Sequence, residues 1–486
     1  MKTLAQLVIL FFCGSLSFSQ ETKNPLFEFR AVWVATVNNI DWPSSKNLSV
    51  QQQKDEFIKL ADLQQKIGMN VLIVQVRSAA DALFPSVYEP WSEFLTGKQG
   101  LPPTPFYDPL AFMIAETHRR NMEFHAWLNP YRAVFDIKSS SIEKYHITKQ
   151  KKEWFLTYGD KKYFNPALQE VRDYFIKIVL DIINRYDVDG IHVDDYFYPY
   201  KIPGKVFPDL KYYIKYNNGL SKDDWRRSNC DSIIKQLWQA INAAPRRVKF
   251  GISPFGVWRN IEKDKLGSNT NAGQTNYDDL YANILLWLKK GWMDYCVPQL
   301  YWERGHELCD YDILLNWWAK NAYNKHMYVG HALYKAGTTK GYRDLNELPN
   351  EIINLRLQNN IQGSVYFSSS NFSKNINGWK DSLQLNYYNT PAIVPPMPWI
   401  DNIKPLPPSI IENVYMVYTL KNINTIPIKG YVLFAGYDKE SAVCKKIITS
   451  FDSEVNVEEF KKDLFTKVYI ASISANNNIS NLVEVK

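Results

Sequence analysis

Short apolar segments alternate with longer amphipathic ones between about residues 29 and 370. A strand followed by a helix, repeated eight times, is typical of an α/β protein of the (β/α)₈ (TIM) barrel class. A doubly wound open sheet is the alternative, but no dinucleotide-binding fingerprint accompanies the strands. Helical patterns between the strands include residues 52–67, 110–120 and 171–185. The predicted strands are residues 29–37, 70–77, 122–129, 190–194, 248–253, 293–301, 326–332 and 363–368.

The alternation of strand and helix patterns stops after the eighth repeat, and we predict three units in the mature protein. The barrel is expected over residues 27–383. Seven prolines within residues 384–408 indicate an extended connector. Residues 409–486 contain short β-type runs separated by polar turns, which favours a small all-β sandwich with a spacer or docking role.

Residues 1–19 have the composition of a secretory signal peptide. Lys2 precedes an apolar stretch of about ten residues, and the small residues Ser17 and Ser19 follow it. That stretch is too short to span a bilayer, so we expect cleavage, no stable membrane insertion and a periplasmic or extracellular protein. Lipid attachment at Cys13 is not expected, because the bulky Phe12 precedes it.

Cysteine usage and net charge limit the remaining possibilities. The four cysteines beyond the signal are too sparse for a disulfide framework; a Cys296–Cys309 bridge stays open, but free thiols are the expectation. The net charge of +7 is small for 486 residues and has no long basic runs, which argues against a nucleic-acid partner. Aromatic residues make up 15% of the chain and could stack on sugar rings.

Polar residues occur at the carboxyl ends of several predicted strands, where barrel enzymes place their active sites. Because side chains alternate along a strand, the inward-facing residues can be chosen by position. Together they predict a polar cleft at the barrel mouth, since burying so many polar groups without partners would be costly. The candidates are Arg77 on the second strand, His125, Trp127 and Asn129 on the third, His192 and Asp194 on the fourth, and Gln299, Tyr301 and Glu303 on the sixth.

Two of these residues, Asp194 and Glu303, are carboxylates that could flank a substrate bond. Glycoside hydrolysis uses such a pair, one as nucleophile or base and the other as proton donor. The stereochemical outcome stays open, because it depends on their separation. Asp195 is expected to orient a neighbour or bind a sugar hydroxyl. A different chemistry, in which Asp194, Asp195 and a histidine hold a metal as in hydrolytic deacetylases, is also considered, but no tight ligand spacing occurs and we expect no metal and no cofactor.

Eight motifs lie at or near the predicted strands. They are Phe-Arg-Ala-Val-Trp-Val-Ala-Thr-Val at 29–37, Ile-Asp-Trp-Pro at 40–43, Ala-Ala-Asp-Ala-Leu at 79–83, Glu-Pro-Trp-Ser at 89–92, His-Ala-Trp-Leu-Asn-Pro-Tyr-Arg at 125–132, Asp-Gly-Ile-His-Val-Asp-Asp-Tyr-Phe-Tyr-Pro at 189–199, Gly-Ile-Ser-Pro-Phe-Gly at 251–256 and Pro-Gln-Leu-Tyr-Trp-Glu at 298–303. With these motifs the chain resembles the glycosyl-hydrolase-10-like family of exported bacterial barrel proteins. The resemblance covers about residues 27–400 and implies a (β/α)₈ barrel, glycosidase activity and, as the polysaccharide substrate, cell-wall glycan stripped of its peptides. The C-terminal segment is similar to fibronectin-type-III-like modules.

The fourth strand also looks like the Asp-Gly-x-Asp-x-Asp-x-Glu signature of chitinase-type barrels, but it departs from that signature. His192 replaces the first internal Asp, and Tyr196 stands where the acid Glu would be. The proton donor is therefore expected elsewhere, at Glu303, with Asp194 as nucleophile or base. The rival interpretation is a catalytically inactive carbohydrate-binding barrel that serves as a surface scaffold. The oligomeric state is left open. The residues expected to position the sugar are Arg77, His125, Trp127, Asn129, His192, Asp195, Gln299 and Tyr301.

Overall fold

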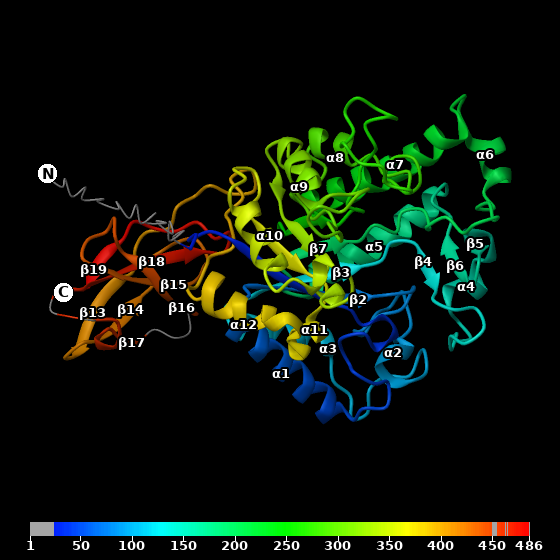
Figure 1. The fold of residues 1–486 in the computed structure, drawn as a ribbon. Coiled ribbons are helices and arrows are strands. Elements are labelled where there is room, and N and C mark those ends of the chain that lie inside the picture. The colour runs from blue at the N-terminus through cyan, green and yellow to red at the C-terminus, as the bar shows by residue number, and fades with distance from the viewer. Residues whose placement is uncertain (1–23, 450–453, 462, 464, 486) are drawn as a thin grey trace, which may run out of the picture.

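A parallel barrel surrounded by helices forms the larger part of the protein (Figure 1). The computed structural model describes residues 24–449, 454–461, 463 and 465–485. The fold class predicted from the sequence is thereby confirmed. The predicted signal peptide, residues 1–19 with Cys13, lies outside the described residues.

The eight predicted strands are all present, and the seventh is interrupted at Tyr328. Its first half pairs with β9 through His326 and Tyr295, and its second half pairs with β12 through Val329 and Ser364. The interrupted strand therefore closes the barrel. The strands are β1 (Phe29–Val34), β2 (Val71–Arg77), β3 (Glu123–Leu128), β7 (Gly190–Val193), β8 (Lys249–Ile252), β9 (Tyr295–Cys296), β10 (His326–Met327) with β11 (Val329–His331), and β12 (Gly363–Tyr366).

The sixth strand is shorter than predicted, because β9 ends at Cys296 whereas the apolar pattern runs to residue 301. Pro298 lacks the N–H group that a continuous strand would use. The chain stays extended beyond it, and Gln299 makes isolated bridges with Phe255 and Gly330. Gln299 and Tyr301 are thus held near the barrel mouth by irregular chain.

Helices cover the outside of the barrel, and their ends match local sequence signals. Ser49 and Gln52 form a capping box at the start of α1, and Gly68, with φ of +99°, ends it. Asp108 caps α3, which has Pro109 in its first turn. The helices are α1 (Val50–Ile67), α2 (Glu93–Thr96), α3 (Pro109–Arg119), α4 (Ile147–Gln150), α5 (Gln169–Arg185), α6 (Leu210–Tyr216), α7 (Lys222–Ala243), α8 (Ile284–Lys290), α9 (Tyr311–Lys320), α10 (Glu347–Arg356), α11 (Ser369–Lys374) and α12 (Trp379–Ser382).

Two apolar layers follow from the alternation of side chains along the strands. Val32, Leu72 and Ile191 belong to the large core between sheet and helices. Phe29 and Ile73 belong to a separate core inside the barrel. The four cysteines of the described chain, Cys230, Cys296, Cys309 and Cys444, are buried free thiols, as expected.

The proline-rich segment and the C-terminal sheets lie at the amino ends of the barrel strands (Figure 1). Val394 and Met397 of this segment pack into the inner core of the barrel. Beyond them, two antiparallel sheets share a core that includes Tyr418, Leu433 and Ile470. The unit boundaries and the fibronectin-type-III-like character stay predictions. The strands are β13 (Ser409–Val414), β14 (Val417–Lys421) and β17 (Glu454–Asn456) in one sheet, and β15 (Ile428–Gly436), β16 (Val443–Thr449), β18 (Lys467–Ser474) and β19 (Val483–Val485) in the other.

A small antiparallel sheet follows the third barrel strand and lies, with α4 and α6, at the opposite end of the molecule from the C-terminal sheets (Figure 1). Its order is β4-β6-β5. This insertion therefore belongs to the carboxyl-end face of the barrel. Its strands are β4 (Arg132–Val134), β5 (Phe155–Tyr158) and β6 (Lys161–Phe164).

Candidate active site

Asp194 follows the last residue of β7 and is 3% exposed. Trp127 Nε1 and Asn129 Nδ2 each donate to its Oδ2 at 3.1 Å, and the Tyr196 backbone N–H donates to its Oδ1. Burial raises the pKa of Asp194, while the charge of Arg132 and these donors oppose the rise. The fourth strand thus delivers a buried carboxylate into a set of donors from the third strand.

Asp195 is the next residue and is 2% exposed. The Tyr200 hydroxyl donates to its Oδ2. Burial and the charge of Asp194 raise the pKa of Asp195 to about 7, although Tyr200 and Gln299 oppose the rise. Because the two charges repel each other, ionisation of one of these adjacent carboxyl groups opposes ionisation of the other.

Both carboxyl groups line a cavity of about 300 Å³ at the carboxyl ends of the strands. Seven of its sixteen lining residues are aromatic and six are polar or charged, a mixture that suits a small-ligand or sugar site. Trp127, Gln299 and Tyr301, predicted from the sequence, lie in it with Asp194 and Asp195. The complete lining is Trp33, Ala35, Val37, Ile40, Gln75, Trp127, Arg132, Asp194, Asp195, Tyr196, Tyr200, Ser253, Gln299, Tyr301, Tyr334 and Phe367.

Asn129 and Arg77 lie behind the cavity and position its wall. Asn129 donates to Asp194 and its Oδ1 accepts from the Arg132 backbone N–H at 2.7 Å, which fixes the turn into β4. Arg77 forms a buried ion pair with Glu89, with Nη2 to Oε1 at 2.6 Å, and donates to the Asn129 carbonyl. Arg77 therefore acts on Asp194 only through Asn129.

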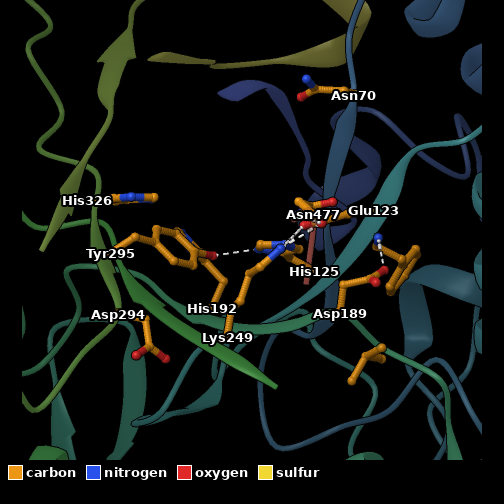
Figure 2. Close-up of polar contacts among 12 residues, drawn as sticks. Asn70, Glu123, His125, Asp189, His192, Lys249, Asp294, Tyr295, His326 and Asn477 are labelled. Carbon is orange, nitrogen blue, oxygen red and sulfur yellow. Dashed lines mark hydrogen bonds and ion pairs between the residues drawn. The ribbon is translucent and has the colours of Figure 1, made fainter. Parts of the chain in front are cut away.

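His192 and His125 belong to a buried chain of hydrogen bonds below the cavity (Figure 2). Trp33 Nε1 can only donate, so His192 Nε2 accepts at 3.2 Å and the ring donates from Nδ1 to the Tyr295 hydroxyl at 3.1 Å. Burial, with the charge of His125, lowers the pKa of His192 well below its usual value, which keeps the ring neutral. The Ser253 hydroxyl, which lines the cavity, also bonds to Nε2 at 2.9 Å.

The chain continues from the Tyr295 hydroxyl to His125 Nδ1 at 2.7 Å, and from His125 Nε2 to Glu123 Oε2 at 3.1 Å. Lys249 Nζ lies 2.6 Å from Glu123 Oε1 (Figure 2). Burial would raise the pKa of Glu123, but the ammonium groups of Lys249 and Lys429 outweigh it and hold the pKa well below the usual range. The two histidines thus support the cavity floor and do not line it.

Glu303, the predicted proton donor, is not part of the cavity lining. Its Oε1 accepts a hydrogen bond from the Thr339 hydroxyl at 2.9 Å. Its side chain also packs so closely on Gly341 that a Cβ atom added to that glycine would collide with it. The irregular chain after Pro298 directs Gln299 and Tyr301 to the cavity and leaves Glu303 beside the segment 339–341.

Sequence reasoning missed several lining residues. Arg132 ends the motif at residues 125–132, and Tyr196 and Tyr200 follow the two acids, so the motifs themselves contained the signal. Trp33 and Gln75 lie on the first two barrel strands, so the alternation of side chains along a strand could have identified them as inward-facing. Tyr334 lies in a loop, where no periodicity identifies an inward residue.

The described part of the chain offers neither a metal-binding cluster nor a membrane-spanning helix. No group of three or more His, Cys, Asp or Glu residues there is arranged to hold a metal ion. None of its helices is long and apolar enough to cross a membrane.

Comparison with known proteins finds extended sequence similarity. The model of the family "Glycosyl hydrolase-like 10" matches residues 28–344. Glycosyl hydrolase YngK of Bacillus subtilis (strain 168) is 45% identical over 437 residues, covering 88% of this chain and 84% of that protein. Glycosyl hydrolase DigH of Escherichia coli (strain K12) is 38% identical over 338 residues, covering 66% of this chain and 75% of that protein. The catalytic domain of β-amylase from Paenibacillus polymyxa aligns with a TM-score of 0.48 at 10% identity, over 75% of this chain and 99% of that one.

Proposed function

The chain belongs to the glycosyl hydrolase-like 10 family, and we propose that it hydrolyses O-glycosidic bonds of a polysaccharide with Asp194 and Asp195 as its catalytic pair. The observation that carries this proposal is the pair itself. Two adjacent carboxyl groups line one cavity; burial raises the pKa of both, and the charge of Asp194 helps to raise that of Asp195 to about 7. A pair in which one group keeps its proton can supply an acid and a base within one site.

Asp194 is the nucleophile or base in this mechanism. Its donors Trp127 and Asn129 favour the carboxylate form and fix its orientation. A carboxylate held in this way either attacks the anomeric carbon or removes a proton from water. The choice between these two depends on where the sugar lies.

Asp195 is the proton donor in this mechanism, in place of Glu303. A carboxyl group whose pKa is about 7 is still about half protonated at neutral pH and can protonate the leaving oxygen. Tyr200 donates to Asp195 and would stabilise the carboxylate after proton transfer. Glu303 lies outside the cavity lining, where it accepts a hydrogen bond from the Thr339 hydroxyl.

The proposed substrate is a glycan strand of the bacterial cell wall from which the peptides have been removed. The aromatic rings that line the cavity, among them Trp33, Trp127 and Tyr301, offer stacking surfaces for sugar rings. The sequence resemblance described above supports the choice of cell-wall glycan, and the composition of residues 1–19 supports export to the compartment that holds it.

The test compares three variants, Asp194→Asn, Asp195→Asn and Glu303→Gln, on peptide-free glycan strands, with products read by mass. We expect Asp194→Asn and Asp195→Asn to lose at least about 100-fold in kcat while still binding the strands, and Glu303→Gln to lose less than about tenfold. Unchanged turnover in Asp194→Asn would contradict the proposal. Binding without turnover by the unmodified protein would favour the rival, an inactive carbohydrate-binding barrel.

A further inference from the structure

One buried cation in the cavity forms no ion pair with any of the described residues. Arg132 is 6% exposed and lines the cavity beside the catalytic pair. Within the described residues, no oxygen atom accepts a hydrogen bond from its guanidinium and no carboxylate lies at ion-pair distance. Its Nε is fully buried without a partner. A buried guanidinium in this state is unusual, because burying an unpaired charge is costly.

The surroundings of Arg132 hold the guanidinium in place without neutralising it. Its guanidinium carbon lies 4.6 Å from the centre of the Tyr196 ring and 5.8 Å from that of Phe135. Its backbone is fixed by Asn129 and by pairing with Tyr163 in β6. The side chain is therefore pre-positioned, with its donors free to meet a ligand that enters the cavity.

Two segments that contribute lining residues, one of them Arg132, carry an excess of positive charge. Residues 130–168, which contain it, carry eight Lys or Arg against four Asp or Glu. Residues 196–221, which follow the two catalytic acids, carry four Lys against one Asp. A local excess of positive charge raises the concentration of anionic ligands near it.

We propose that Arg132 is a specificity-determining residue that binds a carboxylate on the sugar next to the cleaved bond. The inference rests on the proposed function and deepens it by naming the chemical class of the substrate, an acidic polysaccharide. Two sources supply that chemistry: the carboxylate that peptide removal uncovers on a cell-wall glycan, and the carboxylate of a uronic acid polymer. In either case a peptide or ester on the carboxylate removes the charge that Arg132 binds.

The first experiment uses the unmodified protein and four substrates. These are peptide-free cell-wall glycan and polygalacturonate, each with free carboxylates and after methyl esterification. We expect esterification of the cleaved glycan to lower kcat/KM by about 10- to 100-fold, the loss typical of one charge-assisted hydrogen-bonded pair. Whichever of the two polymers with free carboxylates is cleaved identifies the source of the carboxylate that Arg132 binds. Equal cleavage of the free and esterified forms would overturn the proposal.

The second experiment assigns the discrimination to Arg132. Arg132→Gln should cleave the free and esterified glycans with nearly equal kcat/KM, and Arg132→Lys, which keeps the charge but loses the planar fork, should discriminate to an intermediate degree. Lys138→Gln removes a cation from an exposed position in the same insertion and should keep the full discrimination. If Arg132→Gln does not fold, Arg132→Lys still tests the role of Arg132, because its discrimination between free and esterified glycan should be weaker than that of the unmodified protein.

A competing role for Arg132 is to keep Asp194 ionised, since its charge opposes the rise in the pKa of Asp194. That role predicts an equal loss on both glycans and an acidic limb of the pH profile moved to higher pH, a result that would overturn our proposal. If no glycan is cleaved by the unmodified protein, the proposed function fails separately. Binding of free and esterified strands to Asp194→Asn then tests Arg132, and equal affinities would contradict its assignment.

Discussion

Asn477 Nδ2, in the C-terminal part of the chain, donates a 2.8 Å hydrogen bond to Glu123 Oε1 at the start of the third barrel strand. Lys249 binds the same carboxylate from inside the barrel, and Lys429 approaches it at 3.5 Å from β15 (Figure 2 shows Glu123, Lys249 and Asn477). The C-terminal sheets therefore contribute directly to a buried charge cluster of the barrel, at the end opposite the cavity.

Replacing this carboxylate should destabilise the whole molecule. Glu123→Gln leaves the Lys249 ammonium, which is 6% exposed, without its counter-charge, and we expect a loss of about 3–5 kcal/mol in the free energy of unfolding. Urea unfolding followed by fluorescence measures it. Glu459→Gln breaks an ion pair whose two side chains are half exposed and should cost less than about 1 kcal/mol. Equal losses in the two variants would contradict the importance of the cluster.

Activity should fall as the pH rises through about 7. Asp195 donates a proton only while protonated, and burial together with the charge of Asp194 raises its pKa to about 7. The acidic limb reports protonation of Asp194, whose pKa is also raised by burial. Initial rates between pH 4 and 9 on peptide-free glycan give both limbs, which belong to the pair as a whole. Loss of the alkaline limb in Glu303→Gln would instead make Glu303 the donor.

Asp195 should also make the protein less stable at alkaline pH. A carboxyl group whose pKa is raised on folding binds its proton more tightly in the folded state. The stability that this bound proton contributes to the folded state is therefore complete below the unfolded pKa of about 4 and is lost as the pH rises through about 7. The side chain in Asp195→Asn cannot ionise. At pH 8 the free energy of unfolding of this variant should therefore exceed that of the unmodified protein by up to about 4 kcal/mol, since the pKa of Asp195 rises from about 4 to about 7 on folding.

Urea unfolding at pH 5 and pH 8 checks this expectation. Asp173→Asn, which removes an exposed carboxylate from α5, should leave the pH dependence as it is. The same pH dependence in Asp195→Asn as in the unmodified protein would show that another group is responsible.

Removing one donor to Asp194 should move the acidic limb to higher pH. Trp127→Phe keeps an aromatic ring in the cavity but loses the 3.1 Å hydrogen bond to Oδ2. That bond favours the carboxylate, so its loss raises the pKa of Asp194, and we expect a shift of about one pH unit. Tyr334→Phe removes a hydroxyl from the same cavity without touching Asp194, and its acidic limb should stay in place. If the acidic limb of Trp127→Phe lies at the same pH as that of the unmodified protein, this hydrogen bond does not hold down the pKa of Asp194.

Much of the fold followed from local patterns. The apolar strands and amphipathic helices alternate clearly enough to predict eight repeats, and the ends of α1 and α3 follow capping residues that act within one turn. Asp194 could also be chosen from the sequence, because a strand that ends in acids delivers them to the barrel mouth. These features depend on residues close together in the chain.

The assignment of the second acid depends on distant residues. Strand alternation was extended past Pro298 to Glu303, but the chain there is irregular, and Gln299 bridges Phe255 and Gly330 instead. The buried positions of His125 and His192 likewise depend on Tyr295, more than 100 residues along the chain from either. Periodicity gives a face of a strand, but not the depth in the barrel at which a side chain lies.

The sequence by itself determined a barrel with Asp194 at its mouth, since strand and helix periodicity and the turn into the acids are local properties. Tertiary structure decided the raised pKa of Asp195, about 7, and the position of Arg132, which forms no ion pair among the described residues. Both depend on burial and on charges from separate strands, because the pKa of a group and the cost of its charge are set by all atoms within several ångströms, whatever their place in the chain.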